Sequence, residues 1–397
     1  MAGLYLKELC SRGNVRVWLR ANVENGWKTI DVTIGELSAP SGGDFVIAGG
    51  HQDSWLGPQA TDNAAGNACL MELARVFAQH RNELRRGLLF GFWMAHETGT
   101  MAGSCWFVDQ NWRRLREHAV AYLQIDQPAI IDSSQWSTES NVELRRFHQG
   151  IERRLLGNRP FQWHRATRTG DSSFFGIGVP MIAANTGYTE GELKATALAT
   201  LGWWHHSLEN TIDKIDWDLM AVHLRIYGAY LWELCTAPVL PFEFVSVADQ
   251  FRERLEEFRA AGQTIGIGEL IGRAEKLRDA ASGLDGAAQR WQERYRVGEV
   301  KDEEPAELLN ACMKRLSRLL VPLASTAKGT YGHDPYGYTP QTTMIPSLFD
   351  VPKLGTLPLE NEERWQLETQ LIRERNRIAD ALGDACWLID RTLAQVK

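Results

Sequence analysis

The chain has 397 residues, of which 44% are hydrophobic and 23% are charged, and its formal net charge is −7. This composition excludes a disordered or low-complexity protein and is sufficient for a large hydrophobic core. Acidic and basic residues are interspersed without a basic stripe, so nucleic acid is not an expected partner.

Membrane association is not expected either, because no apolar run approaches the roughly 18 residues that a membrane helix needs. The opening residues, MAGLYLKELC, lack the apolar region of a secretory signal. The six cysteines show no CxxC spacing, which favours reduced thiols and a cytoplasmic protein.

The first 240 residues alternate between strand and helix patterns. Alternating apolar and polar residues predict strands within 15–21 and 27–37, with Asn25-Gly26 as a hairpin turn between them. Short apolar runs predict four buried strands, at 45–48, 88–93, 120–125 and 181–184. Helical spacing predicts helices over 67–80 and 103–116. We therefore expect an α/β domain over residues 1–240, built on a mostly parallel sheet flanked by helices.

The pattern becomes helical after Pro241. Helices are predicted over 244–284, 304–320 and 359–396. We expect a second, helical domain over residues 241–397 that also provides a dimer surface. The Gly/Pro/Tyr-rich stretch 329–346 is too long for an ordinary connector and is a candidate functional segment.

Candidate metal ligands follow three of the buried strands. The run 45–48 leads to His51 and Asp53, the run 88–93 to His96-Glu97, and the run 120–125 to Asp126. In parallel α/β sheets, ligands bind beyond the carboxyl ends of the strands. Asp62, in a polar loop, and His205-His206 complete the set. Spacing alone leaves a second interpretation open, in which these residues cap turns or are simply solvated.

Two divalent ions would suit this mixture of side chains. They can share one bridging carboxylate, with imidazoles and further carboxylates completing each ion. Such a pair lowers the pKa of a bound water and polarises a carbonyl oxygen. Asp53, two residues beyond His51, is a candidate for holding that imidazole in the right tautomer.

A family resemblance supports the metal interpretation. The sequence contains the runs GGHQDSW, TDNAAG, FWMAHETGTMAGS, AYLQID and WWHHSLENTIDKID. In order and spacing they resemble the co-catalytic zinc peptidases, a family that includes bacterial aminopeptidases, glutamate carboxypeptidase II and the transferrin receptor. The later runs LLVPLA and HDPYGY…PSLFDV resemble the dimerisation domain of the carboxypeptidase branch, which implies a homodimer.

The resemblance implies a set of metal ligands and a reaction. The ligands would be His51, Asp62, Glu97, Asp126 and His206. Asp62 would bridge two ions, with His51 and Glu97 completing one and Asp126 and His206 the other. The expected metal is zinc, although Mn, Co or Fe suit the same donors. A metal-bridging hydroxide would then cleave an amide or peptide bond.

Three departures from the family pattern qualify this expectation. His96 stands where the family has a glutamate general base, and a neutral imidazole is a candidate proton shuttle in its place. The protease-associated domain and lid of the long relatives have no counterpart here, so either the site is open or a second polypeptide covers it. The lysine–tyrosine pair and arginine patch that hold a C-terminal glutamate are not evident.

These departures favour a small or aromatic amide over a general peptide as substrate. Candidate substrate-binding residues are Asp171, His205, Trp204 and Tyr336. The alternative is a catalytically weakened, receptor-like or partner-dependent homologue that acts as a dimeric binding protein. Turnover, rather than metal content, distinguishes the two.

Overall fold

The computed structural model describes residues 2–40, 42–98, 100–168, 170–335, 337 and 339–396. The chain forms two compact units, Met1–Ile30 and Asp31–Lys397. The first contains α1 (Ala2–Arg12), followed by residues without regular structure. The hairpin expected around Asn25-Gly26 does not form, and β1 begins only at Thr33. A two-stranded hairpin with no face to bury is marginal in water, and Trp27 is fully exposed here.

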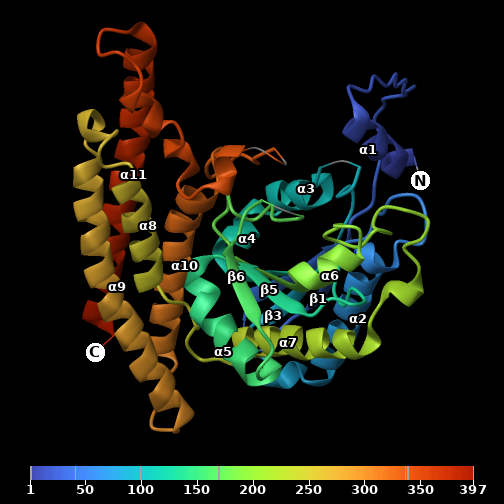
Figure 1. Ribbon diagram of the computed structural model, residues 1–397. Coiled ribbons are helices and arrows are strands. Elements are labelled where there is room, and N and C mark those ends of the chain that lie inside the picture. The colour runs from blue at the N-terminus through green and yellow to red at the C-terminus, as the bar shows by residue number, and fades with distance from the viewer. Residues whose placement is uncertain are drawn as a thin grey trace. The chain divides into compact units, whose positions relative to one another are not determined.

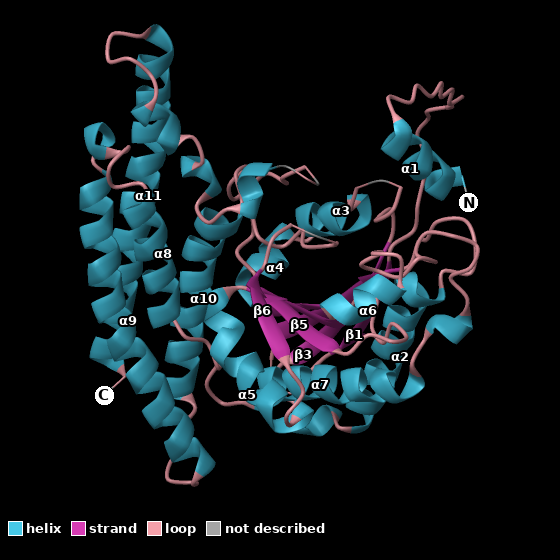
Figure 2. Cartoon of the chain, viewed as in Figure 1, coloured by secondary structure: helices cyan, strands magenta, loops and turns pink. Residues whose placement is uncertain are grey.

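In the described part of the second unit, seven strands form one sheet, in the order β1-β3-β2-β4-β7-β5-β6 (Figure 2). Their bounds are β1 (Thr33–Leu37), β2 (Phe45–His51), β3 (Gly87–Trp93), β4 (Ala119–Gln124), β5 (Gln135–Ser140), β6 (Phe161–Arg165) and β7 (Met181–Gly187). The β2–β3, β2–β4, β4–β7 and β5–β6 pairs are parallel, and β1–β3 and β5–β7 are antiparallel. The predicted mostly parallel sheet is therefore confirmed.

Successive residues of β2 face two separate cores. Val46 and Ala48 pack in the cluster that holds α2 (Ala65–Gln79), α5 (Arg145–Leu156) and α7 (Trp217–Thr236). Phe45 and Ile47 face the cluster that holds Phe107 and Leu115, from α3 (Ala102–Gln110) and α4 (Trp112–His118). Helices thus cover both faces, as expected for a sheet of fully buried strands (Figure 1). The single helix predicted over 103–116 is divided at Asn111. A short helix, α6 (Glu190–Ala195), follows β7.

The C-terminal part contains four long helices: α8 (Val245–Glu257), α9 (Ile267–Arg296), α10 (Glu304–Ser325) and α11 (Glu362–Gln395). The helix predicted over 244–284 is interrupted between α8 and α9, where Gly266 adopts a φ of 77°. α9 packs against both α8 and α11. None of the described helices is long and apolar enough to cross a membrane. The domain boundary near residue 240 stays a prediction.

Candidate metal centre

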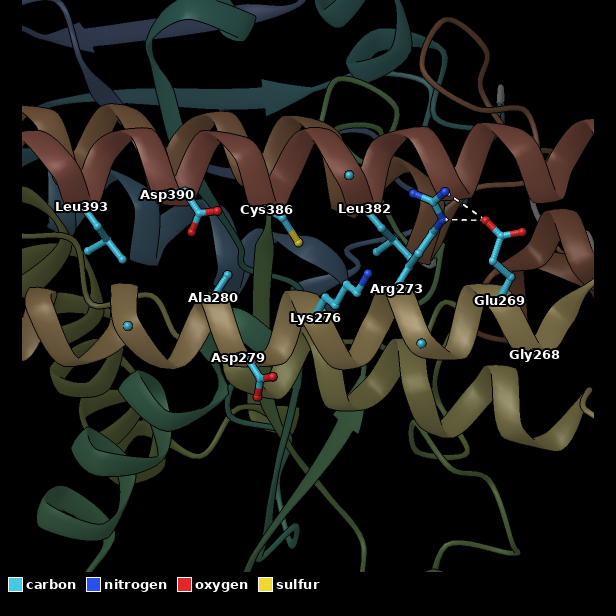
Figure 3. A pocket seen from close by; sticks show the side chains of 13 residues that line it. Gly268, Glu269, Arg273, Lys276, Asp279, Ala280, Leu382, Cys386, Asp390 and Leu393 are labelled. Atoms are coloured by element: carbon cyan, nitrogen blue, oxygen red, sulfur yellow. Dashed lines mark hydrogen bonds and ion pairs between the residues drawn. The ribbon is translucent and has the colours of Figure 1, made fainter.

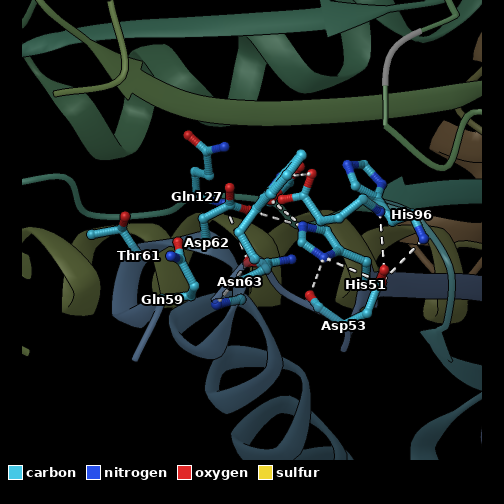
Figure 4. A network of polar contacts seen from close by, with 12 residues as sticks. His51, Asp53, Gln59, Thr61, Asp62, Asn63, His96 and Gln127 are labelled. Carbon is cyan, nitrogen blue, oxygen red and sulfur yellow. Dashed lines mark hydrogen bonds and ion pairs between the residues drawn. The ribbon is translucent and has the colours of Figure 1, made fainter. Parts of the chain in front are cut away.

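The predicted cluster forms at the carboxyl edge of the central strands. β2 ends at His51, which pairs with Trp93 at the end of β3, and Gly49 pairs with Gln124 at the end of β4. The residues that follow these parallel strands therefore meet at one edge. Figure 4 shows His51 and His96 there, and their rings stack with centroids 3.9 Å apart.

Two glycines allow this close approach. A Cβ on Gly49 would lie 2.4 Å from Nε1 of Trp93, and a Cβ on Gly50 would lie 2.5 Å from the carbonyl oxygen of Ile125. Any larger residue at these positions would push neighbouring strand ends apart, so the Gly-Gly pair before His51 is a requirement of the sheet edge.

Asp62 lies between two histidines. Its Oδ1 is 2.9 Å from Nε2 of His51, and its Oδ2 is 2.9 Å from Nε2 of His206. His51 Nε2 also lies 3.3 Å from Oδ1 of Asp126, while His206 Nε2 lies 2.9 Å from Oε1 of Glu97. Two groups of three side chains therefore share the Asp62 carboxylate.

This grouping differs from the expected one, which joined His51 to Glu97 and Asp126 to His206. The closest contacts instead join His51 to Asp126 and His206 to Glu97. The physical reason lies in the turn after β3. Both β3 and β4 lie directly beside β2, but the turn that follows β3 brings the Glu97 carboxylate to the loop that carries His206.

The loops that carry Asp62 and His206 are fastened to each other. Thr61 donates from its backbone N–H and its hydroxyl to Oδ1 of Asn210, at 3.1 and 3.0 Å. His206 itself adopts a φ of 56°, a left-handed conformation that is uncommon outside glycine and that recurs at functional sites. Asn63 donates from Nδ2 to the carbonyl oxygen of Ile125 at 3.0 Å, which fastens the Asp62 loop to the segment after β4 as well.

Asp53 acts differently from the expectation. Nδ1 of His51 bonds the backbone carbonyl oxygen of Asp53 at 2.9 Å, and the nearer carboxylate oxygen is 3.7 Å away. The carboxylate instead accepts hydrogen bonds from the backbone N–H groups of His96 and Glu97, at 3.1 and 3.0 Å. One residue thus fixes the His51 tautomer through its backbone and the His96-Glu97 turn through its side chain.

His96 is held by a polar chain. Its Nδ1 lies 3.0 Å from Oδ2 of Asp171, and Oδ1 of Asp171 accepts a hydrogen bond of 2.7 Å from Ser104. A ring nitrogen of His96 also lies within 4.8 Å of ligand atoms of His51 and Glu97. The imidazole therefore stands beside the carboxylate–imidazole groups with a fixed orientation.

Burial and charge act against each other in this cluster. Burial would lower the pKa of His51, but the carboxylates of Asp126 and Asp62 raise it well above its ordinary value. Burial disfavours the Asp62 carboxylate, yet the hydrogen bond from His51 and the charge of His51 hold the pKa of Asp62 below its usual range. Burial and the neighbouring Asp62 raise the pKa of Glu97. Burial lowers the pKa of His205.

The donor set fits divalent metal ions. Oδ1 of Asp126 and Nδ1 of His205 are buried without a hydrogen-bond partner among the described residues. Three carboxylates converge with three imidazoles that can each offer a lone pair, and such a concentration of acceptors calls for a cation. Thiolates are not part of the described groups, so the donors suit zinc as well as Mn, Co or Fe.

The predicted substrate-binding residues have separate outcomes. His205 lies 3.4 Å from Oδ2 of Asp62, and Asp171 is committed to His96. Trp204 is only 4% exposed and packs in the interior. Tyr336 lies outside the described residues. The roles of all four stay predictions.

Sequence reasoning missed several contacts in the site. Trp55 donates from Nε1 to Oε2 of Glu97 at 2.8 Å, and Ser104 donates to Asp171. Asn210 ties the two ligand loops together. These partners are distant in sequence, so local patterns could not reveal them. The quoted runs DSW, MAGS and SLEN contain all three residues.

Comparison with known proteins finds one matching family model and several similar sequences. A family model described as Peptidase family M28 matches residues 33–231. The probable glutamate carboxypeptidase VP8 of Zea mays is 27% identical over 239 residues, covering 54% of this chain and 32% of that protein. Aminopeptidase NAALADL1 of Mus musculus is 36% identical over 86 residues, covering 21% of this chain and 11% of that protein. The chain thus spans at most about a third of the length of these relatives.

A solved structure also aligns with about half of the chain. The aminopeptidase from Aneurinibacillus sp. strain AM-1 aligns with a TM-score of 0.44 and 22% identity, covering 51% of this chain and 48% of that one. The matched family segment, residues 33–231, comprises half of the chain and contains all five predicted metal ligands. This chain belongs to peptidase family M28.

Proposed function

We propose that this protein is a hydrolase that cleaves an amide bond with two divalent metal ions, of which zinc is the favoured choice. The observation that carries the proposal is the sharing of Asp62 between two groups of ligands. His51 and Asp126 would complete one ion, and His206 and Glu97 the other, in accordance with the distances between these side chains. When bound, such ions supply an activated water and stabilise negative charge on a carbonyl oxygen.

His96 is proposed to accept the proton of the attacking water at Nε2. Asp171 accepts from Nδ1 and so leaves the lone pair of Nε2 available on the side of the imidazole that is not engaged. A glutamate at this position would carry a negative charge; the imidazole acts without one. The stacked His51 ring and the Asp171 contact restrict its rotation.

The surroundings of the site favour a small or aromatic amide. Trp55 is 47% exposed and lies against the ring of His206, with centroids 5.2 Å apart. Trp203 is 56% exposed on the same loop as His206. Phe174 and Phe175, by contrast, are buried in the core and belong to the packing of the sheet. Two exposed indoles near the ligands would contact a flat or apolar group.

The second candidate is a binding protein with weak turnover. The substitution of a histidine for the family's glutamate at position 96 favours it, because a weaker base slows hydrolysis. A separate polypeptide covering the site would favour it as well.

One experiment separates the candidates. Purified protein is assayed for metal content and for hydrolysis of a panel of aminoacyl anilides, dipeptides and N-acyl aromatic amides, before and after chelation. About two ions per chain with chelator-sensitive turnover supports the hydrolase. Metal without turnover on any member of the panel supports the binding protein, and the absence of metal contradicts both.

We also propose that the chain forms a homodimer through a groove between α9 and α11. The groove has a volume of about 890 Å³, and Figure 3 shows side chains of both helices lining it. Gly268 and Gly272 have open space around them, and the nearby Trp387 is 60% exposed. Light scattering is expected to give a dimer mass, and Gly272→Arg is expected to give a monomer. A monomeric native protein would contradict this proposal.

A further inference from the structure

Cys105 lies within a cluster of charged and polar side chains. Its Sγ is 3.2 Å from Nη2 of Arg168 and 3.3 Å from Oγ of Ser173. His333 lies close enough to this sulfur to lower the pKa of the thiol. Nε2 of His333 in turn lies 2.9 Å from Oδ1 of Asp109. A thiol, an imidazole and a carboxylate therefore stand in series, with a guanidinium against the sulfur.

The cluster is assembled from three distant parts of the sequence. Cys105 and Asp109 come from α3, Arg168 from the segment after β6, and His333 from the Gly/Pro/Tyr-rich stretch that the sequence marked as a candidate functional segment. Such a constellation resembles a nucleophile, a base and a group that orients the base.

The environment of Arg168 also indicates a negative charge on the sulfur. Its side chain is 94% buried (6% exposed), and its Nε has no hydrogen-bond partner among the described residues. Its other contacts are to Cys105 and, at 3.5 Å, to the carbonyl oxygen of Ser172. A buried guanidinium without a carboxylate partner in the described part of the chain calls for a negative charge beside it. The sulfur is the group within reach that can supply one.

The other cysteines show how unusual this environment is. Burial raises the pKa of Cys69 and Cys235 to about 12 and that of Cys312 to about 11. Burial acts in the same direction on Cys105, but the contacts with His333 and Arg168 outweigh it and lower the pKa of this thiol. Burial and the nearby carboxylate of Asp390 raise the pKa of the half-buried Cys386, although Lys276 and Arg273 act in the opposite direction.

We propose that Cys105 is a nucleophilic thiolate and a modification site for small electrophiles, with hydroperoxides as the natural class of reactant. The proposal does not depend on the amide hydrolysis described above.

A hydroperoxide would oxidise the Cys105 thiolate with the help of His333 and Arg168. The thiolate sulfur attacks the nearer oxygen of a hydroperoxide, so that an S–O bond forms while the O–O bond breaks. The sulfur loses two electrons and becomes a sulfenic acid, and the peroxide is reduced. The departing oxygen takes a proton from the His333 imidazolium and leaves as water or an alcohol. Arg168 stabilises the negative charge during transfer.

The modified sulfur would lie close to the metal centre. Ser173, which contacts Cys105, also contacts Oγ of Ser104 at 2.8 Å. Ser104 donates to Asp171, the partner of His96. The cluster is nevertheless distinct, because none of its members is among the proposed metal ligands.

Site-resolved alkylation tests the proposal. The folded protein is treated briefly with iodoacetamide at pH 7, and each cysteine is quantified by peptide mass spectrometry. Cys105 is expected to react about tenfold or more faster than the half-buried Cys386 and faster than the exposed Cys10. Treatment with hydrogen peroxide and dimedone is expected to place the sulfenic-acid adduct on Cys105.

Two variants link the reactivity to its cause. His333→Gln, at a partly exposed position, is expected to slow the alkylation of Cys105 about tenfold, and Arg168→Gln is expected to slow it as well. His118→Gln, at a partly exposed histidine of α4, is the matched control and leaves the rate unchanged. The proposal is overturned if Cys105 reacts no faster than Cys386, or if His333→Gln and His118→Gln give the same rate.

Discussion

Nδ1 of His96 lies 3.0 Å from Oδ2 of Asp171, and both side chains are largely buried. Burial lowers the pKa of His96, but the hydrogen bond to Asp171 and the charges of Asp171 and Asp126 outweigh burial and raise it above its ordinary value. An imidazole held in this way has one defined tautomer and one direction for its free lone pair. In the proposed function, the pair takes the place of the glutamate base that the family resemblance implies.

The first prediction concerns this pair. His96→Ala is expected to lower kcat about 10²–10⁴-fold, because proton transfer in the transition state is lost. Asp171→Asn is expected to lower kcat about 10–100-fold, with little change in KM, since it disturbs the orientation and tautomer of His96. Steady-state kinetics on a hydrolysed amide measures both. His96→Glu, which restores the residue of the family, is expected to recover turnover.

The double variant provides the control for this prediction. If Asp171 acts through His96, then His96→Ala combined with Asp171→Asn is no slower than His96→Ala alone. Additive losses would show that Asp171 has a separate role. Asp213→Asn, at an exposed carboxylate outside the cluster, leaves kcat unchanged.

The second prediction concerns the sharing of ligands. Elemental analysis is expected to give about two ions per native chain, and about one in His51→Ala or His206→Ala. Asp62→Ala is expected to weaken both sites. His51→Ala with Asp126→Ala still retains about one ion, because both residues belong to the same group. His51→Ala with His206→Ala retains almost none. If His51→Ala with Asp126→Ala also retains almost no metal, the pairing expected from sequence is restored, because that pairing places the two residues on different ions.

Much of the site was predictable because it depends on where strands end. Buried apolar runs identify the central strands, and parallel pairing brings His51, Glu97 and Asp126 to one edge. The pairing of ligands was not predictable, since it depends on the paths of the loops after the strands and on the direction of their side chains. The polar strands β5 and β6 were missed for a related reason. Two of the three buried residues of β5, Thr138 and Ser140, are polar and form hydrogen bonds with Glu152 and His148, and β6 has no fully buried residue.

Contacts between residues that are distant in sequence could not be predicted either. His333 lies in a stretch that sequence analysis identified as unusual, but its partner Asp109 is 224 residues away in the chain. The prediction of a hairpin at Asn25-Gly26 was wrong although it rests on residues that are adjacent in sequence. Its local turn signal is sound, but residues 13–32 find no sheet to join.

The third prediction concerns a buried carboxylate in the core. Oε1 of Glu152 accepts from Trp136 at 3.3 Å, Thr138 at 2.5 Å, His148 at 3.0 Å and Tyr230 at 2.6 Å. Glu152→Ala leaves these donors buried and unpaired, so the free energy of unfolding is expected to fall by about 3–5 kcal/mol. Urea denaturation followed by circular dichroism measures the change.

An exposed ion pair between α5, which carries Glu152, and α7, which carries Tyr230, provides the control for Glu152. Arg154 of α5 contacts Glu233 of α7 at 2.9 Å, with both side chains exposed. Glu233→Ala is expected to change the free energy of unfolding by less than about 1 kcal/mol. Equal losses in Glu152→Ala and Glu233→Ala would contradict the assigned role of the buried carboxylate.

The fourth prediction concerns Asp285 of α9, which caps the neighbouring helix α8. Its carboxylate accepts from the backbone N–H groups of Phe244 at 3.1 Å and Val245 at 3.0 Å. Burial outweighs these hydrogen bonds and raises the pKa of Asp285 to about 6. The folded state therefore binds the proton more tightly than the unfolded state. The resulting stabilisation is complete below pH ~4 and is lost as the pH rises through about 6.

Asp285→Asn isolates this contribution, because an amide oxygen still accepts from the two N–H groups but does not titrate. Each pKa unit corresponds to about 1.4 kcal/mol, so native protein is expected to lose roughly 2–3 kcal/mol relative to the variant between pH 4 and 7. Urea unfolding of both proteins at several pH values measures the difference, from which the titrations of all other groups cancel. A difference that is constant with pH would show that Asp285 keeps an ordinary pKa in the folded chain. A difference of the opposite sign would show that the backbone N–H groups of α8 prevail over burial.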